Sequence, residues 1–234
     1  LEAALARRDV ALVLTEPALT NAGVIRPESG FHKALRHLTR ATGTLLAIDE
    51  THTLVSAYGG LTGEWGLEPD FLTLGKSLAA GVPLATYGMT EALADLIAPP
   101  EVAWEVSGDA VLEVATGGTL FANALSMAAG RAALGEVLTE EAFDRTTRLG
   151  GRVADGIQTA IEEASLPWHV VRLFAHSYYA FAPRPPRNAI EYRADEVPEL
   201  RALIRVYLAN RGIWEAGWWR GPAVSVAHTD EDVD

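Results

Sequence analysis

Short apolar runs that end on polar functional side chains constrain the fold of this chain more than any other feature. Three runs have this form: residues 10–14 before Glu16, residues 44–48 before Asp49, and residues 71–74 before Lys76. They are apolar on both faces and only four or five residues long, as is typical of strands in a buried parallel sheet. A fourth run at 84–88 extends the pattern.

Helical patterns separate and follow these runs. The segment Phe31–Arg40 has apolar residues at 31, 34, 35 and 38, and it stops at Gly43. Further helices are predicted at 91–97, 123–138, 140–164 and 197–211, and further strands at 169–174, 178–181 and 223–227. This alternation predicts an α/β fold with a mostly parallel sheet sandwiched by helices. A change of texture places a domain boundary between residues 1–137 and a smaller α+β domain at 138–234.

Charge and residue usage exclude several classes of protein. There are 19 Lys+Arg against 31 Asp+Glu, a net charge of −12, which argues against a nucleic-acid or anionic-membrane surface. The lack of cysteine excludes disulfides and thiolate metal sites, and His169, His176 and His228 are too scattered for a metal site. The apolar runs are too short to span a bilayer, and no signal peptide is visible. We therefore expect a cytoplasmic protein with no nucleic-acid or membrane partner.

The side chains at the strand ends indicate a cofactor. Carboxyl ends of parallel strands meet at one edge of a sheet, where ligands bind. An Asp and a Lys there suit a cofactor with a cationic ring nitrogen and an aldehyde, because the carboxylate keeps the nitrogen protonated and the amine forms a Schiff base. Lys33 and Lys76 are the only lysines among 19 basic residues, and the others are arginines. A lysine at a strand end in such a sequence indicates that an amine is required there. Two simpler alternatives stay open: Lys76 as an ordinary solvated lysine, and Asp49 as a helix cap.

A series of motifs runs through nearly the whole chain. In order, they are Glu16-Pro17-Ala-Leu-Thr-Asn21, Asp49-Glu50, Gly59-Gly60, Trp65-Gly66-Leu-Glu-Pro69-Asp70, Thr73-Leu-Gly75-Lys76, Gly117-Gly118-Thr119-Leu-Phe-Ala-Asn123, Glu215-Ala216-Gly217 and Ala227-His228-Thr229. Together they closely resemble class III pyridoxal-phosphate aminotransferases, in particular the glutamate-1-semialdehyde aminomutase-like subgroup. The resemblance implies the type I fold of PLP-dependent transferases, with pyridoxal 5′-phosphate as cofactor. It also implies that 1–137 is the C-terminal half of the large cofactor-binding domain, that 138–234 is the small domain, incomplete at its end, and that the chain is the C-terminal part of a longer protein.

The resemblance assigns a role to each matching site residue. Lys76 would form the Schiff base and act as the general acid–base, and Asp49 would pair with the pyridinium nitrogen. Thr51 would pack against one face of the ring. Asn21 would lie near the ring and the substrate, and Glu16 would support the Asp49 side of the site. For these last two residues a structural role stays open: an Asx turn at Asn21 and a loop anchor at Glu16.

The resemblance also predicts a site shared between subunits. Thr119, with the Gly118 backbone, would bind the phosphate of the cofactor in the neighbouring subunit, so the active form would be a homodimer. Thr119 is also a candidate N-cap of the helix predicted at 123–138.

The chain departs from the family pattern at several positions. Thr51-His52 follows Asp-Glu where an aliphatic residue is usual, and His52 is either a polar contact near the cofactor or a packed side chain. Leu54-Val55-Ser56 replaces the arginine expected of an aminomutase. An insertion at 101–115, which carries Trp104, predicts an extra hairpin. Trp214, Trp218 and Trp219 form either core packing or a wall facing the substrate, and Glu215 is interpreted as a rim charge.

The function implied is amino-group transfer. The protein would be an aminotransferase that uses a small-molecule amino donor and a keto acid acceptor, with the PLP Schiff base on Lys76. One alternative is an aminomutase, which shifts the amino group within one molecule. Another is a non-catalytic or truncated relative that folds without chemistry.

Overall fold

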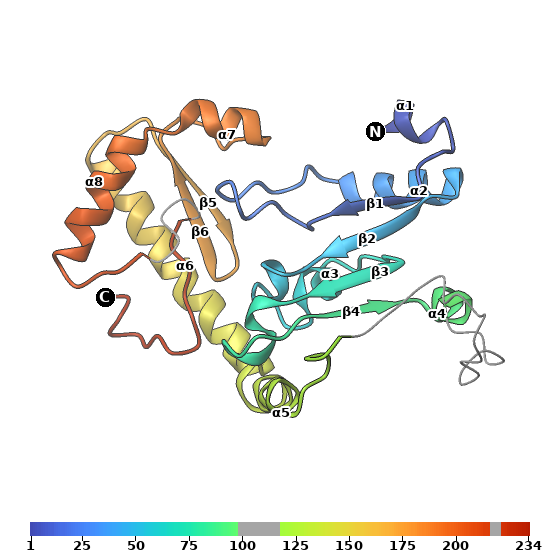
Figure 1. Cartoon of the computed structure of the whole chain (residues 1–234). Helices are drawn as coiled ribbons and strands as arrows, with labels where there is room; N and C mark the ends of the chain where they lie inside the picture. Colours follow the sequence, from blue (N-terminus) through green and yellow to red (C-terminus); the bar gives the residue numbers. More distant parts are fainter. Residues whose placement is uncertain (98–117, 216–220) are drawn as a thin grey trace.

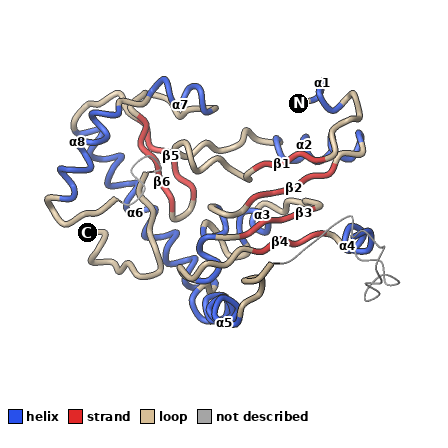
Figure 2. The backbone as a smooth tube through the Cα atoms, in the orientation of Figure 1, coloured by secondary structure: helices blue, strands red, loops and turns tan. Residues whose placement is uncertain are grey.

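The computed structural model describes residues 1–97, 118–215 and 221–234. Its first sheet has the order β1 (Leu12–Thr15), β2 (Leu45–Asp49), β3 (Phe71–Leu74) and β4 (Thr86–Met89). The first three strands are parallel, and β4 runs antiparallel to β3 (Figures 1 and 2). The predicted strands are therefore present, with bounds shifted by up to two residues, in a mostly parallel sheet.

The described helices are α1 (Glu2–Leu5), α2 (Phe31–Thr42), α3 (Gly60–Glu64), α4 (Glu91–Ile97), α5 (Ala124–Ala132), α6 (Glu140–Glu163), α7 (Ala189–Asp195) and α8 (Pro198–Ala209), with short 3-10 turns η1 (Thr53–Val55) and η2 (Lys76–Ala79). Helices α2, α4, α6 and α8 lie close to their predicted positions, whereas α3 and α7 were not predicted. Helix α2 buries Leu35 against Leu46 and Ile48 of β2. It ends at Gly43, whose φ of +73° is a left-handed conformation that favours glycine.

The Ala-rich helix differs from its prediction at both ends. Instead of one helix over 123–138, α5 passes at Ala133 into a π-helical turn, η4 (Ala133–Val137). Asn123 caps α5, since its side chain accepts a hydrogen bond from the N–H of Ser126 at 3.0 Å. The alternative that Thr119 caps this helix is therefore wrong.

The second sheet is a hairpin of β5 (His169–Leu173) and β6 (His176–Ala180). It packs on α6 through a core of Ala154, Ile161, Val170 and Tyr179. The strand predicted at 223–227 is wrong, because Ala223 forms only an isolated bridge to His176. After it, the N–H of Ser225 donates to Nδ1 of His228 at 3.0 Å, and this turn leads the chain away from β6.

The hairpin joins the two sheets through one shared core. Ala18 and Val24, which follow β1, and Ala57 and Leu61, which follow β2, pack with Tyr178 and its neighbours in β5 and β6. Figure 1 shows the β5–β6 hairpin beside the edge of the first sheet at which these loops begin. The division at residue 137 stays a prediction. Within the described ranges, no helix is long and apolar enough to cross a membrane.

Candidate functional site

Three candidate side chains come together at the ends of β1, β2 and β3. Glu16 follows β1, Asp49 ends β2 in register with Thr73, and Lys76 follows β3 after one residue. The charges of both Asp49 and Lys76 act on the carboxyl of Glu16, so the three groups share one electrostatic environment. The structure thus places these predicted site residues at one edge of the sheet.

Asp49 is held as a carboxylate. Its Oδ1 accepts a hydrogen bond from the N–H of Thr51 at 2.8 Å. Burial raises the pKa of Asp49, but hydrogen bonds from Thr51 and Thr73 and the charge of Lys76 together outweigh burial, so the pKa lies below its ordinary value. The environment of Asp49 therefore favours a negative charge at the end of β2.

Glu16 has the opposite balance. Burial raises the pKa of Glu16, the nearby charge of Asp49 raises it further, and hydrogen bonds from Thr20 and the charge of Lys76 offset only part of this. The hydroxyl of Thr20 donates to the Glu16 carboxylate at 3.2 Å. The adjacent carbonyl of Pro17 accepts a hydrogen bond from Nε2 of His32 at 2.7 Å, which anchors this loop to α2.

Lys76 opens the turn η2 with a left-handed backbone, φ +44°, which is uncommon for a residue with a side chain. Gly75 before it packs closely on Thr51, because a Cβ there would lie 3.3 Å from the methyl group of Thr51. Lys76 is exposed, and it lines a cavity of about 170 Å³. The other residues that line this cavity are Thr20, Val24, Thr51, His52, Val55, Ser77 and His176.

The other predicted site residues lie outside this cavity. Asn21 is exposed in the hairpin between Leu19 and Ile25. Gly118 and Thr119 are exposed in the loop before α5. Trp218, Trp219 and the insertion at 101–115 lie outside the described residues.

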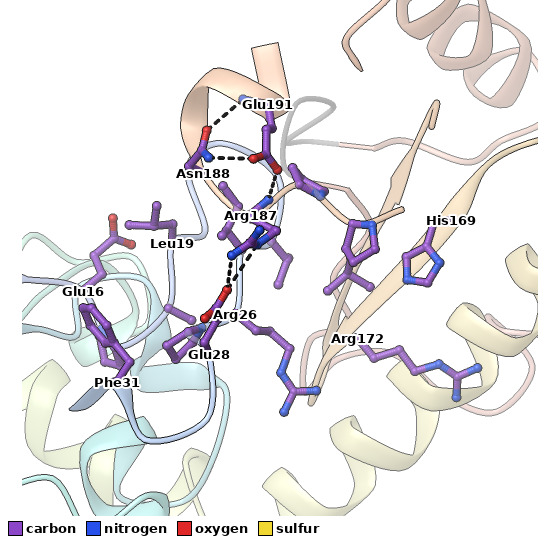
Figure 3. Close-up of a pocket in the computed structure, with 18 of the residues that line it drawn as sticks. Glu16, Leu19, Arg26, Glu28, Phe31, His169, Arg172, Arg187, Asn188 and Glu191 are labelled. Atoms are coloured by element: carbon purple, nitrogen blue, oxygen red, sulfur yellow. Dashed lines mark hydrogen bonds and ion pairs between the residues drawn. The ribbon is translucent and has the colours of Figure 1, made fainter. Parts of the chain in front are cut away.

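A larger cavity adjoins the site on the side of Glu16. It has a volume of about 880 Å³ and lies between residues 15–31 and the segments 169–172 and 185–191. Figure 3 shows Arg187 reaching across it to Glu28, with which it forms an ion pair at 2.5 Å. Glu28 and Arg187 are mostly exposed, so this ion pair contributes little to stability.

Sequence reasoning missed two residues. Glu50 is buried, and its carboxylate accepts hydrogen bonds from the hydroxyl of Thr53 and the N–H of Thr62. A Cβ at Gly60 would lie 2.8 Å from Oε1 of Glu50, so the Gly59-Gly60 motif was the signal for this anchor. His176 lines the Lys76 cavity from β6, a hundred positions along the chain, and no local signal indicates it.

Comparisons with known proteins identify the family. The family model described as "Aminotransferase class-III" matches residues 1–172. The chain belongs to the class III aminotransferase family. The structure of this chain confirms the PLP-dependent transferase fold that the resemblance implied.

Glutamate-1-semialdehyde aminomutases are among the most similar relatives. The enzyme of Anaeromyxobacter sp. (strain K) is 32% identical over 225 residues, 96% of this chain and 50% of the relative. A crystal structure of a glutamate-1-semialdehyde-aminomutase from Pseudomonas aeruginosa PAO1 is 41% identical with a TM-score of 0.92, covering 99% of this chain and 51% of the other. A β-phenylalanine aminotransferase from Variovorax paradoxus is 26% identical with a TM-score of 0.83, over 99% and 52%. The chain thus spans about half the length of these relatives.

The cofactor of the family is pyridoxal 5′-phosphate, and a second structure of the Pseudomonas aeruginosa protein is a complex with PMP. The residues of this chain fit that group. Asp49 offers a carboxylate with a lowered pKa, Lys76 offers an amine at the next strand end, and Thr51, whose methyl group lies near Gly75, lines the same cavity as Lys76.

Proposed function

We propose that the protein, at its natural length, is a PLP-dependent aminotransferase that moves an amino group from a small amine or amino acid to a keto acid. One observation carries the proposal: an anionic Asp49 and the amine of Lys76 stand at neighbouring strand ends. A pyridine aldehyde needs these two groups, an amine that binds its aldehyde and a carboxylate that pairs with its ring nitrogen.

Each residue has a separate task in this proposal. When bound, pyridoxal phosphate supplies an aldehyde that takes up amino groups and a protonated ring that withdraws electrons from the amino carbon. The Nζ of Lys76 would hold the aldehyde group of the cofactor, and once the amine of the substrate has displaced it, the free amine would accept and return the proton that moves during amino transfer. Asp49 keeps the ring nitrogen protonated, and Thr51 packs on one ring face. Glu16 supports the Asp49 side, and Asn21 lies near the ring and the substrate.

We further propose that two copies of the chain form the active unit, with Gly118 and Thr119 binding the cofactor phosphate of the partner. Large apolar side chains beside them support this proposal. Leu120 is 78% exposed, Phe121 64% and Leu125 71%, and a second copy that covers this region would remove these apolar side chains from water. The cytoplasmic location and the domain division at residue 137 belong to the same proposal.

An aminomutase is the second candidate. The similarity to glutamate-1-semialdehyde aminomutases favours it. The apolar character of the chain beside the site favours the aminotransferase, since Val55 lines the Lys76 cavity where an aminomutase-like protein would carry an arginine nearby. The requirement for a keto acid distinguishes the two reactions, because a mutase turns over without an external acceptor.

Borohydride reduction followed by peptide mapping tests the proposed function directly. The protein at its natural length is supplied with PLP and reduced, and a pyridoxyl adduct is expected on Lys76. Lys33 in the same digest is the internal control, since it does not line the cavity of Lys76 and should stay unmodified. An unmodified Lys76 in excess cofactor would contradict the proposal and favour a relative that folds without chemistry.

A further inference from the structure

The hairpin that follows Glu16 packs directly on a tyrosine of the C-terminal sheet. Leu19 and Ile25 close the hairpin with two backbone hydrogen bonds of 3.0 and 2.8 Å. Gly23 lies within it at φ +66°, and a Cβ at that position would be 2.9 Å from ring atoms of Tyr178. Glycine is therefore required at position 23 for two reasons, its left-handed backbone conformation and the close approach of the ring.

A buried ion pair holds the hydroxyl end of Tyr178. Its side chain is 1% exposed, and its hydroxyl donates to Oε1 of Glu196 at 2.7 Å. Glu196 pairs at 2.6 Å with Arg201, whose side chain is fully buried and whose guanidinium lies over the rings of Tyr178, Tyr179 and Phe181. Burial and the hydrogen bond to Glu196 raise the pKa of Tyr178, so the phenol remains a donor. The ring therefore has one orientation.

The other side of the same hairpin belongs to the candidate active site. Thr20 and Val24 line the cavity that contains Lys76. The hydroxyl of Thr20 also donates to the carboxylate of Glu16, which interacts electrostatically with Asp49 and Lys76. A displacement of the hairpin would therefore move both the wall of the cavity and a carboxyl group near the lysine.

We propose that Tyr178, held by Glu196 and Arg201, is a positioning residue that sets the hairpin 19–25, and through Thr20 the carboxyl of Glu16, at the Lys76 site. The proposal rests on the proposed function and deepens it, because it assigns to the C-terminal region a part in arranging the site. A displaced hairpin should therefore lower kcat and shift the pH dependence of the cofactor absorbance. The cofactor should still attach to Lys76.

Gly23→Ala tests the contact, and Gly66→Ala is its matched control. Both glycines have left-handed backbones, +66° and +59°, so both variants carry the same kind of backbone strain. A Cβ at Gly66 meets nothing within 4 Å, whereas one at Gly23 meets the ring of Tyr178. The difference between the two variants therefore isolates the contact with the ring.

Four quantities are measured in the protein at its natural length: the borohydride-trapped fraction on Lys76, kcat, KM for the amino donor, and the pH dependence of the cofactor absorbance. For Gly23→Ala we expect full trapping, kcat lowered about tenfold or more, and a shifted pH profile, because small misplacements at a reacting centre cost one to two powers of ten. For Gly66→Ala we expect wild-type kcat within about twofold and an unchanged profile, because the reacting centre is not displaced.

A second pair of variants covers the case in which Gly23→Ala does not fold. Tyr178→Phe loses the hydroxyl bond to Glu196 but keeps the ring against Gly23 and beneath Arg201, whereas Tyr178→Leu removes the ring. The first should therefore retain kcat within about threefold, and the second should lose about tenfold. Equal kcat, KM and pH profiles within each pair would overturn the positioning role while leaving the proposed function intact. Absence of a Lys76 adduct in the wild type would instead overturn the proposed function and, with it, the role of the hairpin.

Discussion

Replacement of Glu50 by alanine tests the anchor of the loop that follows Asp49. Glu50 is 1% exposed, and its carboxylate accepts hydrogen bonds from the hydroxyl of Thr53 and the N–H of Thr62. Alanine leaves both donors without this acceptor, and the hydroxyl of Thr53 is buried. The loop between residues 50 and 62 then has no common acceptor at its centre.

The expected loss in the free energy of unfolding follows from these two bonds. A hydrogen bond to a charged acceptor contributes about 1.5–3 kcal/mol, so two of them contribute about 3–6 kcal/mol. Removal of a buried carboxylate also removes the cost of its desolvation, which offsets part of the loss. The net effect of Glu50→Ala should be a destabilisation of about 2–4 kcal/mol.

Glu50→Gln is the matched control. The amide oxygen accepts from the N–H of Thr62, and the amide nitrogen donates to the hydroxyl of Thr53, which accepts as readily as it donates. This variant should lose about 1 kcal/mol or less. Urea unfolding of both variants beside the wild type, in the absence of added cofactor, gives the two differences. If the alanine and glutamine variants were equally stable, Glu50 would not anchor this loop.

Three further predictions concern titration and helix capping. Arg36 holds the pKa of Asp70 below its ordinary value through two hydrogen bonds of 2.7 and 2.8 Å, so this pair stabilises the fold above the ordinary Asp pKa, and the contribution disappears as the pH falls through the lowered one. Wild type should therefore lose more stability on acidification than Asp70→Asn, in unfolding measured at a series of pH values. The pKa of Glu16 is raised, so its contribution is present below the ordinary Glu pKa and is lost as the pH rises through the raised one; Glu16→Gln should gain stability relative to wild type over that interval. Asn123→Ala removes the cap on the N–H of Ser126 and should cost about 1 kcal/mol in the same unfolding assay.

Local patterns predicted the elements whose cause is local. The stripe of apolar residues in α2 and the glycine that ends it are both within a few residues, and the helix lies at Phe31–Thr42 as expected from 31–40. The strand at 71–74 and the helix at 91–97 have the predicted bounds. Such elements need no knowledge of the rest of the fold, because their period and their stop signals are contained in the segment itself.

Features that depend on distant contacts were missed. Nothing in the segment 223–227 indicates that Ser225 bonds to His228 and turns the chain away after one bridge to β6. The approach of His176 to Lys76 depends on how the β5–β6 hairpin packs against the first sheet. The family resemblance supplied the identities of Asp49, Thr51 and Lys76, but the place of His176 beside Lys76 is found only from the folded structure.

The two carboxyl groups of the site show why identity alone does not assign a role. Asp49 and Glu16 follow neighbouring parallel strands, and each feels the charge of Lys76, yet their pKa values move in opposite directions. Burial raises the pKa of both groups, but at Asp49 the hydrogen bonds from Thr51 and Thr73 outweigh it, whereas at Glu16 the charge of Asp49 adds to burial and the hydrogen bonds from Thr20 offset only part of it. Environments that separate two pKa values in this way suit the groups to different tasks. Asp49 is therefore the stronger acid of the two, and Glu16 more readily holds a proton.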